Sequence, residues 1–428
     1  MYRRILHNRS CNLILLGEGA ASLGERSLFM IILWLLLDAG SLWLAVALAA
    51  ATAVPSLIVS AVGPRLLDAA ADLRILVGLD LLCALAIAAL SLGVDHVPLG
   101  GVLGVGLVLG LRGIVARSNL HALVPSLVTP REAGAVIGLL DLVDRLAMVA
   151  GPGAAALLLH VLAPPQLVLV DAAAFGLSAV ALLLLRRQLG PGPVRSAART
   201  ERPASGPSGR CATLRRRPHL AYGIAIRTLG AVLWPTITLG MPLFVARDLA
   251  LPMTAYGTVL GCYAVASIAG NVLGVWLAAR TTLRRLCGTA WALTGLSFVA
   301  LSATTSLAWL AIAYAVAGLA MPVGILAIST TIAGLDGEAA RADLYATQRT
   351  LMDVGNLAGV VVAGFALGIG AGTAIGMAGG ALVLGVVAVL GGWVRSDRSR
   401  TYRAAASSDS SPARSGRPGG QTMAPSRT

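Results

Sequence analysis

Ionisable side chains occur inside long apolar stretches of this sequence. A charged group near a bilayer centre costs about 2.5–3.5 kcal/mol on insertion scales, so it is expected to face a cavity or a partner. Glu25 lies in the middle of one apolar stretch, and Asp171 lies near one end of another. A carboxyl group held away from water can bind and release a proton near neutral pH. We therefore predict Glu25 as a proton carrier and Asp171 as a second candidate. The alternative for each is a hydrogen-bonded structural acid.

A second set of charged residues is predicted to form a network near one membrane face. It contains five acids and four arginines, a near balance that paired charges require. Asp141, Asp144 and Arg145 stand at positions i, i+3 and i+4, on one face of a helix. Two interpretations are open: structural bridges between helices, or a gate whose bridges close one mouth of a pathway when the other opens. The set is Glu18, Asp80, Arg112, Asp141, Asp144, Arg145, Arg227, Arg349 and Asp353.

Aromatic residues are concentrated in the second half, where 14 of the 19 follow residue 210. This bias predicts that the second half supplies apolar and aromatic walls for a ligand, although any one aromatic ring can instead serve packing or lipid contact. Pro235 and Pro242 interrupt the stretch 219–245, and interrupted helices with polar neighbours are typical of a transport pathway. The predicted substrate-binding residues are Arg26, Tyr222, Trp234, Tyr263, Asn271, Trp291 and Tyr314.

Motifs for catalysis and cofactor binding are not found in the sequence. There is no P-loop, GxSxG, HExxH or zinc-ligand spacing. The five cysteines form no CxxC pair and indicate neither a metal site nor a disulfide framework. The glycine-rich run 100–113 lies in an apolar stretch and follows no strand, so it indicates close helix packing. We predict no enzyme activity, no cofactor and no metal.

The composition sets the fold class that must position these residues. The 428 residues are 57% hydrophobic and 12% charged, with a mean hydropathy of +0.82. A soluble domain is about 25% charged, so soluble enzymes, disordered chains and disulfide scaffolds are excluded. Twelve apolar stretches of about 20 residues remain, each long enough to cross a bilayer as a helix. These stretches are 12–37, 41–62, 75–94, 98–118, 134–160, 165–185, 219–245, 256–279, 286–304, 307–333, 343–367 and 372–394.

The arginines indicate how these helices are oriented. All 33 basic residues are arginine, and the formal net charge is +14. Nine arginines lie in the connection 186–218 and seven follow residue 394, whereas the opposite set of connections contains one, Arg247. This asymmetry follows the positive-inside rule and predicts that both termini are cytoplasmic. It also accounts for the basic charge, so nucleic-acid binding is not expected.

The chain is predicted to consist of two halves. The connection 186–218 is rich in Gly, Pro, Ser and Arg, as a flexible cytoplasmic linker would be. It separates two six-helix bundles, 12–185 and 219–395, which together form an all-α membrane protein of twelve transmembrane helices. A short cytoplasmic N-terminus, 1–11, precedes them, and a disordered cytoplasmic tail, 396–428, follows.

Two spacings recur between the halves. The pattern R-x-x-M-x-x-G occurs at Arg145 and again at Arg349, with an offset of 204 residues. A second pair, Gly63 to Arg74 and Gly274 to Arg285, has an offset of 211 residues. Two matches at nearly one offset indicate a duplication, typical of transporters whose halves are related by an axis along the membrane normal.

The connection from Gly63 to Arg74 carries Gly63, Asp68 and Arg74 at a spacing that resembles the signature loop of the major facilitator superfamily (MFS), and departs from that loop at 69, 72 and 73. Within the MFS, the sequence resembles the bacterial exporters that include siderophore and macrolide efflux permeases. Ala147-x-x-x-Gly151-Pro152 is similar to the motif of antiporting members. The segments 116–125 and 170–175 also look like this branch.

The resemblance implies roles for individual residues. Asp68 and Arg74 would take part in gating, Arg112 would match a functional arginine of the exporters, and Glu25 would match an acid in their first helix. The function expected is proton-coupled efflux of a small, partly hydrophobic molecule (a drug, siderophore or natural product) by alternating access. Two alternatives are open: an importer or facilitator of the same fold, and a non-transporting receptor or scaffold. The expected setting is the inner (cytoplasmic) membrane, with protons, the substrate and the lipid bilayer as partners of a monomer.

Overall fold

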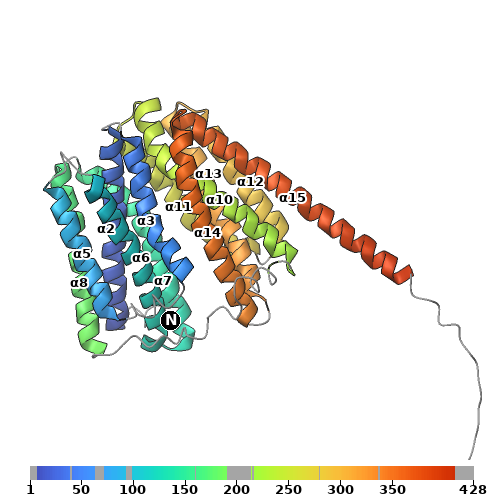
Figure 1. Ribbon diagram of the computed structural model, residues 1–428, viewed down its shortest axis with the longest axis horizontal. Coiled ribbons are helices and arrows are strands. Elements are labelled where there is room, and N and C mark those ends of the chain that lie inside the picture. Colours follow the sequence, from blue (N-terminus) through green and yellow to red (C-terminus); the bar gives the residue numbers. More distant parts are fainter. Residues whose placement is uncertain are drawn as a thin grey trace, which may run out of the picture.

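Figure 1 shows a computed structural model of the chain. The structure describes residues 7–38, 41–62, 72–92, 99–159, 161–189, 214, 216–278, 280–335 and 338–409. Long helices fill this part of the chain: α2 (Arg9–Asp38), α3 (Leu42–Val62), α5 (Leu73–Ser91), α6 (Leu99–Leu127), α7 (Pro130–Leu158), α8 (Pro164–Leu189), α10 (Pro218–Leu243), α11 (Met253–Ala278), α12 (Leu283–Ser302), α13 (Leu307–Ala333), α14 (Glu338–Leu367) and α15 (Ala371–Asp409). A π-helical turn, η3 (Phe244–Asp248), extends α10.

Local chemistry sets several helix starts. Pro130, Pro164 and Pro218 each begin a helix, a position where the missing N–H would have no partner anyway. Asp72 caps α5, because its carboxylate accepts a hydrogen bond from the backbone N–H of residue 74 at 2.9 Å. Between these starts, the apolar stretches pair their backbone groups internally, as a lipid setting demands.

Ten helices are long and apolar enough to cross a membrane, counted over the described residues. The two long helices outside this group are α7 and α12. Helix α7 carries Asp141, Asp144 and Arg145, which lower its hydropathy. The prediction of an all-helical protein is therefore confirmed. Of the twelve membrane spans predicted from the sequence, ten meet the length and hydropathy expected of a span within the described residues.

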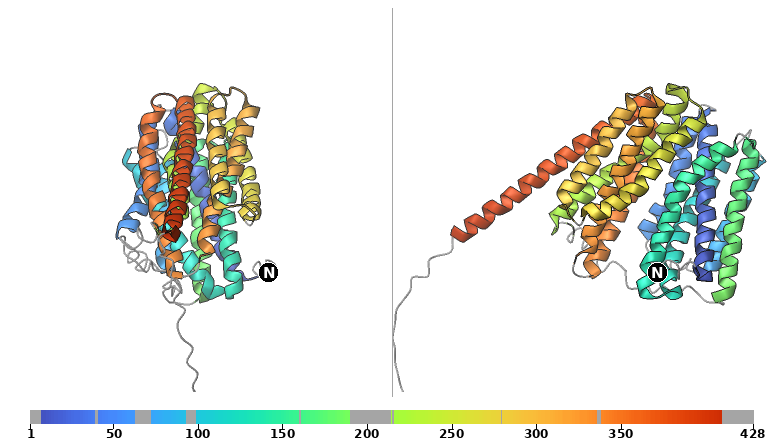
Figure 2. Two further views of the ribbon diagram at one scale, coloured as in Figure 1. Left: turned by 90° about the vertical axis from the view of Figure 1, so that its right-hand side faces the viewer. Right: turned by 180° about the vertical axis from the view of Figure 1, so that it is seen from behind.

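Each half of the chain repeats one packing pattern (Figures 1 and 2). In the first half, α2 packs on α7 and α8, α5 packs on α6 and α8, and α3 packs on α6. In the second half, α10 packs on α14 and α15, α12 packs on α13 and α15, and α11 packs on α13. The same five pairs recur when the helices are matched in chain order, which supports the duplication predicted from the repeated spacings.

The glycines of the repeated motif lie at corresponding helix crossings. Gly151 of α7 faces the backbone of α2, where an added Cβ would come within 3.2 Å of the Leu23 carbonyl oxygen. Gly355 of α14 faces α10, where a Cβ would lie 3.3 Å from the Thr228 carbonyl oxygen. Small residues permit this approach in both halves.

The halves meet mainly along two helix pairs, α7 with α11 and α3 with α14, and α2 also contacts α10. At the start of α3 and the end of α14, the ring of Trp43 meets that of Phe365 edge-on, with centroids 5.3 Å apart. Because α2 runs from the N-terminus to the start of α3, this contact lies at the end of the molecule opposite the N-terminus (Figure 1). One buried apolar cluster there includes residues of both halves, among them Leu36, Val46 and Leu367.

Helix α15 leaves the body of the molecule as a single rod (Figure 1). It continues to Asp409 and so enters the segment 396–428, which was predicted to be disordered. Residues 410–428 lie outside the described part of the chain.

Candidate functional site

A cavity of about 730 Å³ lies between the two halves. Its wall comes from α2, α3, α6 and α7 of the first half and from α10, α13 and α14 of the second. The charged residues that line it are Glu18, Glu25, Arg26, Arg112, Arg117, Asp144, Arg227, Arg349 and Asp353. The cavity is lined by the parts of the helices that lie toward the end of the molecule where α2 begins. The Trp43–Phe365 contact lies past the other end of the cavity. We call this space the central cavity.

Two smaller cavities adjoin the central cavity. The first, of about 210 Å³, shares Glu25, Arg26 and Asn356 with it and is also lined by Trp234 and Pro235. The second, of about 190 Å³, shares Arg227 and Asn356 with the central cavity. Its apolar wall is formed by Trp234, Trp291, Met321, Ile325 and Met352. We call this second space the side cavity.

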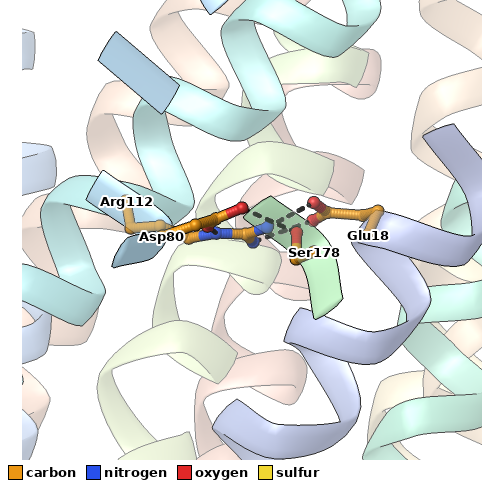
Figure 3. A network of polar contacts seen from close by, with 4 residues as sticks. All are labelled: Glu18, Asp80, Arg112 and Ser178. Carbon is orange, nitrogen blue, oxygen red and sulfur yellow. Dashed lines mark hydrogen bonds and ion pairs between the residues drawn. The ribbon is translucent and has the colours of Figure 1, made fainter. Parts of the chain in front are cut away.

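A buried network of charges joins four helices of the first half (Figure 3). The Arg112 guanidinium donates to Asp80 at 2.7 Å and to Glu18 at 2.9 Å and 3.3 Å. The Ser178 hydroxyl donates to the other Asp80 oxygen at 2.6 Å. The side chains of Arg112 and Asp80 are 1% and 0% exposed, while that of Glu18 is 18% exposed and faces the central cavity.

This network holds one cation between two carboxylates. Arg112 lies on α6, Glu18 on α2, Asp80 on α5 and Ser178 on α8. Desolvating charges is expensive unless each one is paired and hydrogen-bonded, and here every member has a partner. In this conformation the network therefore braces helices of one half.

The predicted proton carriers have different surroundings. Glu25 lines both the central cavity and the 210 Å³ cavity, and its side chain has no hydrogen bond or ion pair within the described residues. The next residue, Arg26, donates to Asp144 of α7 at 3.3 Å. Asp171 is 3% exposed, accepts a hydrogen bond from the Ser27 hydroxyl at 3.2 Å, and lines none of these three cavities. Of the two predicted carriers, Glu25 lines the cavities and Asp171 does not.

The second half contributes fewer ion pairs to the cavity wall. Arg349 donates to Asp353 at 3.3 Å, one turn further along α14. Arg227 of α10 lines the central and side cavities, and the structure gives its side chain neither a hydrogen bond nor an ion pair among the described residues. Gln348 is 6% exposed, and its side-chain oxygen is buried without a donor.

The predicted aromatic and polar binding residues divide into two groups. Trp234 and Trp291 line the side cavity, and Arg26 lines the central one. The others lie away from these three cavities. The Tyr222 hydroxyl donates to the Gly392 carbonyl at 3.2 Å, and the Asn271 amide donates to the Ser267 carbonyl of its own helix at 2.9 Å. The Tyr263 hydroxyl donates to the Met321 sulfur at 3.4 Å, and the ring centroids of Tyr263 and Tyr314 lie 4.6 Å apart.

The remaining predicted gating residues are placed as follows. Arg74 is exposed at the start of α5, 3.9 Å from the carboxylate of Asp72. Asp68 lies outside the described residues, as do the side chains of Asp141 and Arg145 on α7. Every ion pair found in the described part of the chain joins residues of the same half.

Several cavity and network residues carry no signal in the sequence. Ser178 and Ser27 are ordinary serines in apolar helices, yet each donates to a buried carboxylate. Thr52 and Ser56 of α3 line the central cavity, although nothing in their spacing marks them. No group of His, Cys, Asp or Glu side chains suited to a metal ion is found among the residues that the structure describes.

Comparisons with known proteins place the fold. No family model and no curated protein matches the sequence. The solved structures that match include several transporters. The human organic anion transporter MFSD10 (TETRAN) superposes with a TM-score of 0.57 at 17% identity, covering 89% of this chain and 99% of that one. The POT family transporter PepTSo gives a TM-score of 0.68 at 11% identity, covering 91% and 98%.

A further match has a defined conformation. A bacterial homolog of the human lysosomal transporter Spinster, in an inward-facing and unoccupied state, gives a TM-score of 0.62 at 11% identity and covers 89% of this chain and 95% of that one. The chain therefore shares the fold of these transporters, as the MFS resemblance implied, and it is a multi-pass membrane protein.

Proposed function

We propose that this chain is a secondary active transporter that exports a small, partly hydrophobic molecule in exchange for protons. The observation that carries the proposal is the central cavity, which both halves enclose and into which Glu25 faces. Two halves with one packing pattern can rock about such a cavity and so move its opening from one membrane face to the other. The shared fold with transporters agrees with this mechanism.

We place all twelve long helices across the membrane, as two six-helix bundles over 12–185 and 219–395. Helices α7 and α12 are included because they pack in the pattern of the other ten. The arginine-rich connection 186–218 and both termini are placed in the cytoplasm by the positive-inside rule. On this placement the central cavity faces the cytoplasm of the inner membrane, and the Trp43–Phe365 contact closes the outer side.

The gate is proposed to consist of charges that face one another across the cytoplasmic part of the cavity. Asp144 of the first half and Arg349 and Asp353 of the second half line the same cavity. Each is now paired within its own half at 3.3 Å, and their side chains are 37%, 53% and 19% exposed in that order. When the cytoplasmic side closes, exchange of these partners between the halves would stabilise the outward-facing state. Asp68, Arg74, Asp141 and Arg145 are proposed members of the same gate.

Proton coupling is proposed to depend on Glu25. Its carboxyl group lines the central cavity and has no hydrogen-bonding partner among the described residues, so a proton can reach it from the cavity. Arg26 beside it is engaged by Asp144. Asp171 remains the second candidate carrier, with a structural role through Ser27 as its alternative.

The test uses everted membrane vesicles with an acidic lumen, which contains a pH-sensitive dye. Ethidium and naphthalene-2-sulfonate serve as probes, because both are permanently charged and carry no protons by themselves. In the wild type, an exported probe should raise the lumenal pH beyond the change seen in vesicles that lack the protein. Glu25→Gln should abolish this response and leave probe binding intact, because the amide cannot carry a proton.

Glu132→Gln is the matched control. Glu132 accepts hydrogen bonds from the Thr129 hydroxyl at 2.8 Å and the Thr129 N–H at 3.3 Å, at the start of α7. Glutamine serves equally in such a capping box, so this variant should behave as the wild type. Retained proton exchange in Glu25→Gln would eliminate Glu25 as the carrier. Probe binding with no flux of any probe would favour the scaffold, and proton entry together with the probe in right-side-out vesicles would favour the importer.

A further inference from the structure

One arginine of the central cavity differs from its neighbours. Arg26, Arg112 and Arg349 each donate to a carboxylate within 3.3 Å. Arg117 has no such partner within the residues that the structure describes, but it is exposed to solvent. Arg227 is half-buried, and its Nε hydrogen is fully buried without an acceptor. No carboxylate lies within ion-pair distance of Arg227 in the described part of the chain.

A guanidinium group stays charged in proteins, so Arg227 carries a positive charge that no carboxylate of the described residues compensates. Such a charge is unfavourable away from bulk water unless an anion satisfies it. The three neighbouring arginines show how this chain usually meets the requirement, with a carboxylate from a nearby turn or helix. No carboxylate of the described residues plays this part for Arg227, and Arg227 lines both the central and the side cavity.

The cavity walls around Arg227 indicate what kind of ligand would fit beside it. Arg227 stands where the central cavity meets the side cavity of about 190 Å³, whose walls include Trp234, Trp291 and Met352. These walls suit a compact apolar or aromatic body. Asn356 lines all three cavities, and its side-chain amide makes no hydrogen bond within the described residues. A hydrogen-bond donor is therefore also available beside the cation.

We infer that Arg227 anchors the carboxylate of a small organic anion whose apolar body occupies the side cavity. This inference rests on the proposed function, and it names the substrate class of that transporter. A carboxylate matches the planar guanidinium through two parallel hydrogen bonds. A single negative charge fits better than a dianion such as a phosphate monoester, because Asp353 lines the same cavity and Glu25 lines the adjoining ones.

The test measures binding to the purified full chain in detergent by isothermal titration calorimetry. The probes are 2-naphthoate and 2-naphthamide, which have nearly the same shape and differ in charge. The wild type should bind the acid at least tenfold more tightly than the amide. Arg227→Gln should weaken binding of the acid about tenfold to hundredfold, the range for a lost charge-assisted hydrogen bond, and should leave binding of the amide unchanged.

Two further variants complete the experiment. Arg227→Lys keeps the charge and should retain part of the preference, and it also serves if Arg227→Gln fails to fold. Arg117→Gln removes an arginine from the opposite wall of the central cavity and should retain the full preference. Size-exclusion profiles and thermal unfolding check the fold of each variant.

Three results would overturn the inference: wild type that binds the acid no more tightly than the amide, a preference that persists in Arg227→Gln, or an equal loss in Arg117→Gln. The last result would assign the preference to the general field of the cavity. Binding is measured without a proton gradient, so its outcome is separate from the vesicle experiment. Proton exchange that depends on Glu25, together with an unaltered preference in Arg227→Gln, would leave the proposed function standing and remove this inference alone.

Discussion

The buried network around Arg112 permits a quantitative test of what stabilises the first half. Arg112→Gln removes the cation that lies between Glu18 and Asp80. Glu18 faces the central cavity and can be hydrated there, but Asp80 is fully buried and keeps only the Ser178 hydroxyl as a donor. The variant therefore leaves an unpaired carboxylate among four packed helices.

The expected losses can be ranked from the geometry. Removing one partner of a buried ion pair costs about 3–5 kcal/mol, so Arg112→Gln should lose that amount. Asp80→Asn should lose about 1.5–3 kcal/mol, because Arg112 keeps Glu18 and the amide oxygen still accepts a hydrogen bond. Arg349→Gln is the control, since it breaks a surface pair within one helix that contributes about 0.3–0.5 kcal/mol.

The assay is thermal unfolding of the purified variants in one detergent, with the surviving folded fraction measured by size-exclusion chromatography. Membrane proteins of this size often unfold irreversibly, so apparent midpoints are compared at one heating rate. Arg112→Gln should have the lowest midpoint, and the double variant Arg112→Gln/Asp80→Asn should regain part of the loss because both buried charges are gone. The reasoning is refuted if Arg112→Gln has the same apparent midpoint as Arg349→Gln, or if the midpoint of the double variant is no higher than that of Arg112→Gln.

Two further predictions concern packing and closure. Gly359→Leu should reduce the yield of folded protein severely, because a Cβ at Gly359 collides with the Val232 carbonyl oxygen of α10. Gly104→Leu should be tolerated, because a Cβ at Gly104 meets open space. Expression followed by size-exclusion chromatography measures the folded yield of both variants. In a cysteine-free background, Val46→Cys with Gly364→Cys should form a disulfide under oxidation, since a Cβ at 364 lies 3.2 Å from a Val46 methyl group. The cross-link should stop probe flux reversibly, and unchanged flux in the fully cross-linked protein would contradict alternating access at this closure.

The helices could be predicted from the sequence because they answer to a local constraint. A long apolar stretch has to pair its own backbone groups, so its length and its flanking arginines suffice to find it. The spacing R-x-x-M-x-x-G also predicted a real similarity, since Gly151 and Gly355 lie at corresponding helix crossings. A residue where two helices cross closely has to be small whatever surrounds it, so this requirement can be recognised from the residue type in the sequence.

The partners of the charged residues could not be predicted in the same way. Arg112 lies 32 residues from Asp80 and 94 residues from Glu18, and the pairing depends on how α2, α5 and α6 pack. The near balance of acids and arginines predicts paired charges, but a balance does not assign partners. Tyr263 and Tyr314 illustrate the same limit: their aromatic character was visible, yet only packing decides that they face each other at 4.6 Å and lie away from the cavities.

The division of labour between the halves follows from where the cations are compensated. In the first half, Arg26 and Arg112 are already neutralised by Asp144, Glu18 and Asp80, so a ligand anion gains little by approaching them. In the second half, the aromatic walls were expected, but the uncompensated Arg227 was not distinguished from the other charges. Arg117 of the first half has no carboxylate partner among the described residues either, but it is exposed to solvent, whereas Arg227 is half-buried beside the aromatic walls. The cavity should therefore separate two tasks. Proton exchange falls to Glu25 on one wall and ligand charge to Arg227 on the other, and the two can be altered independently by mutation.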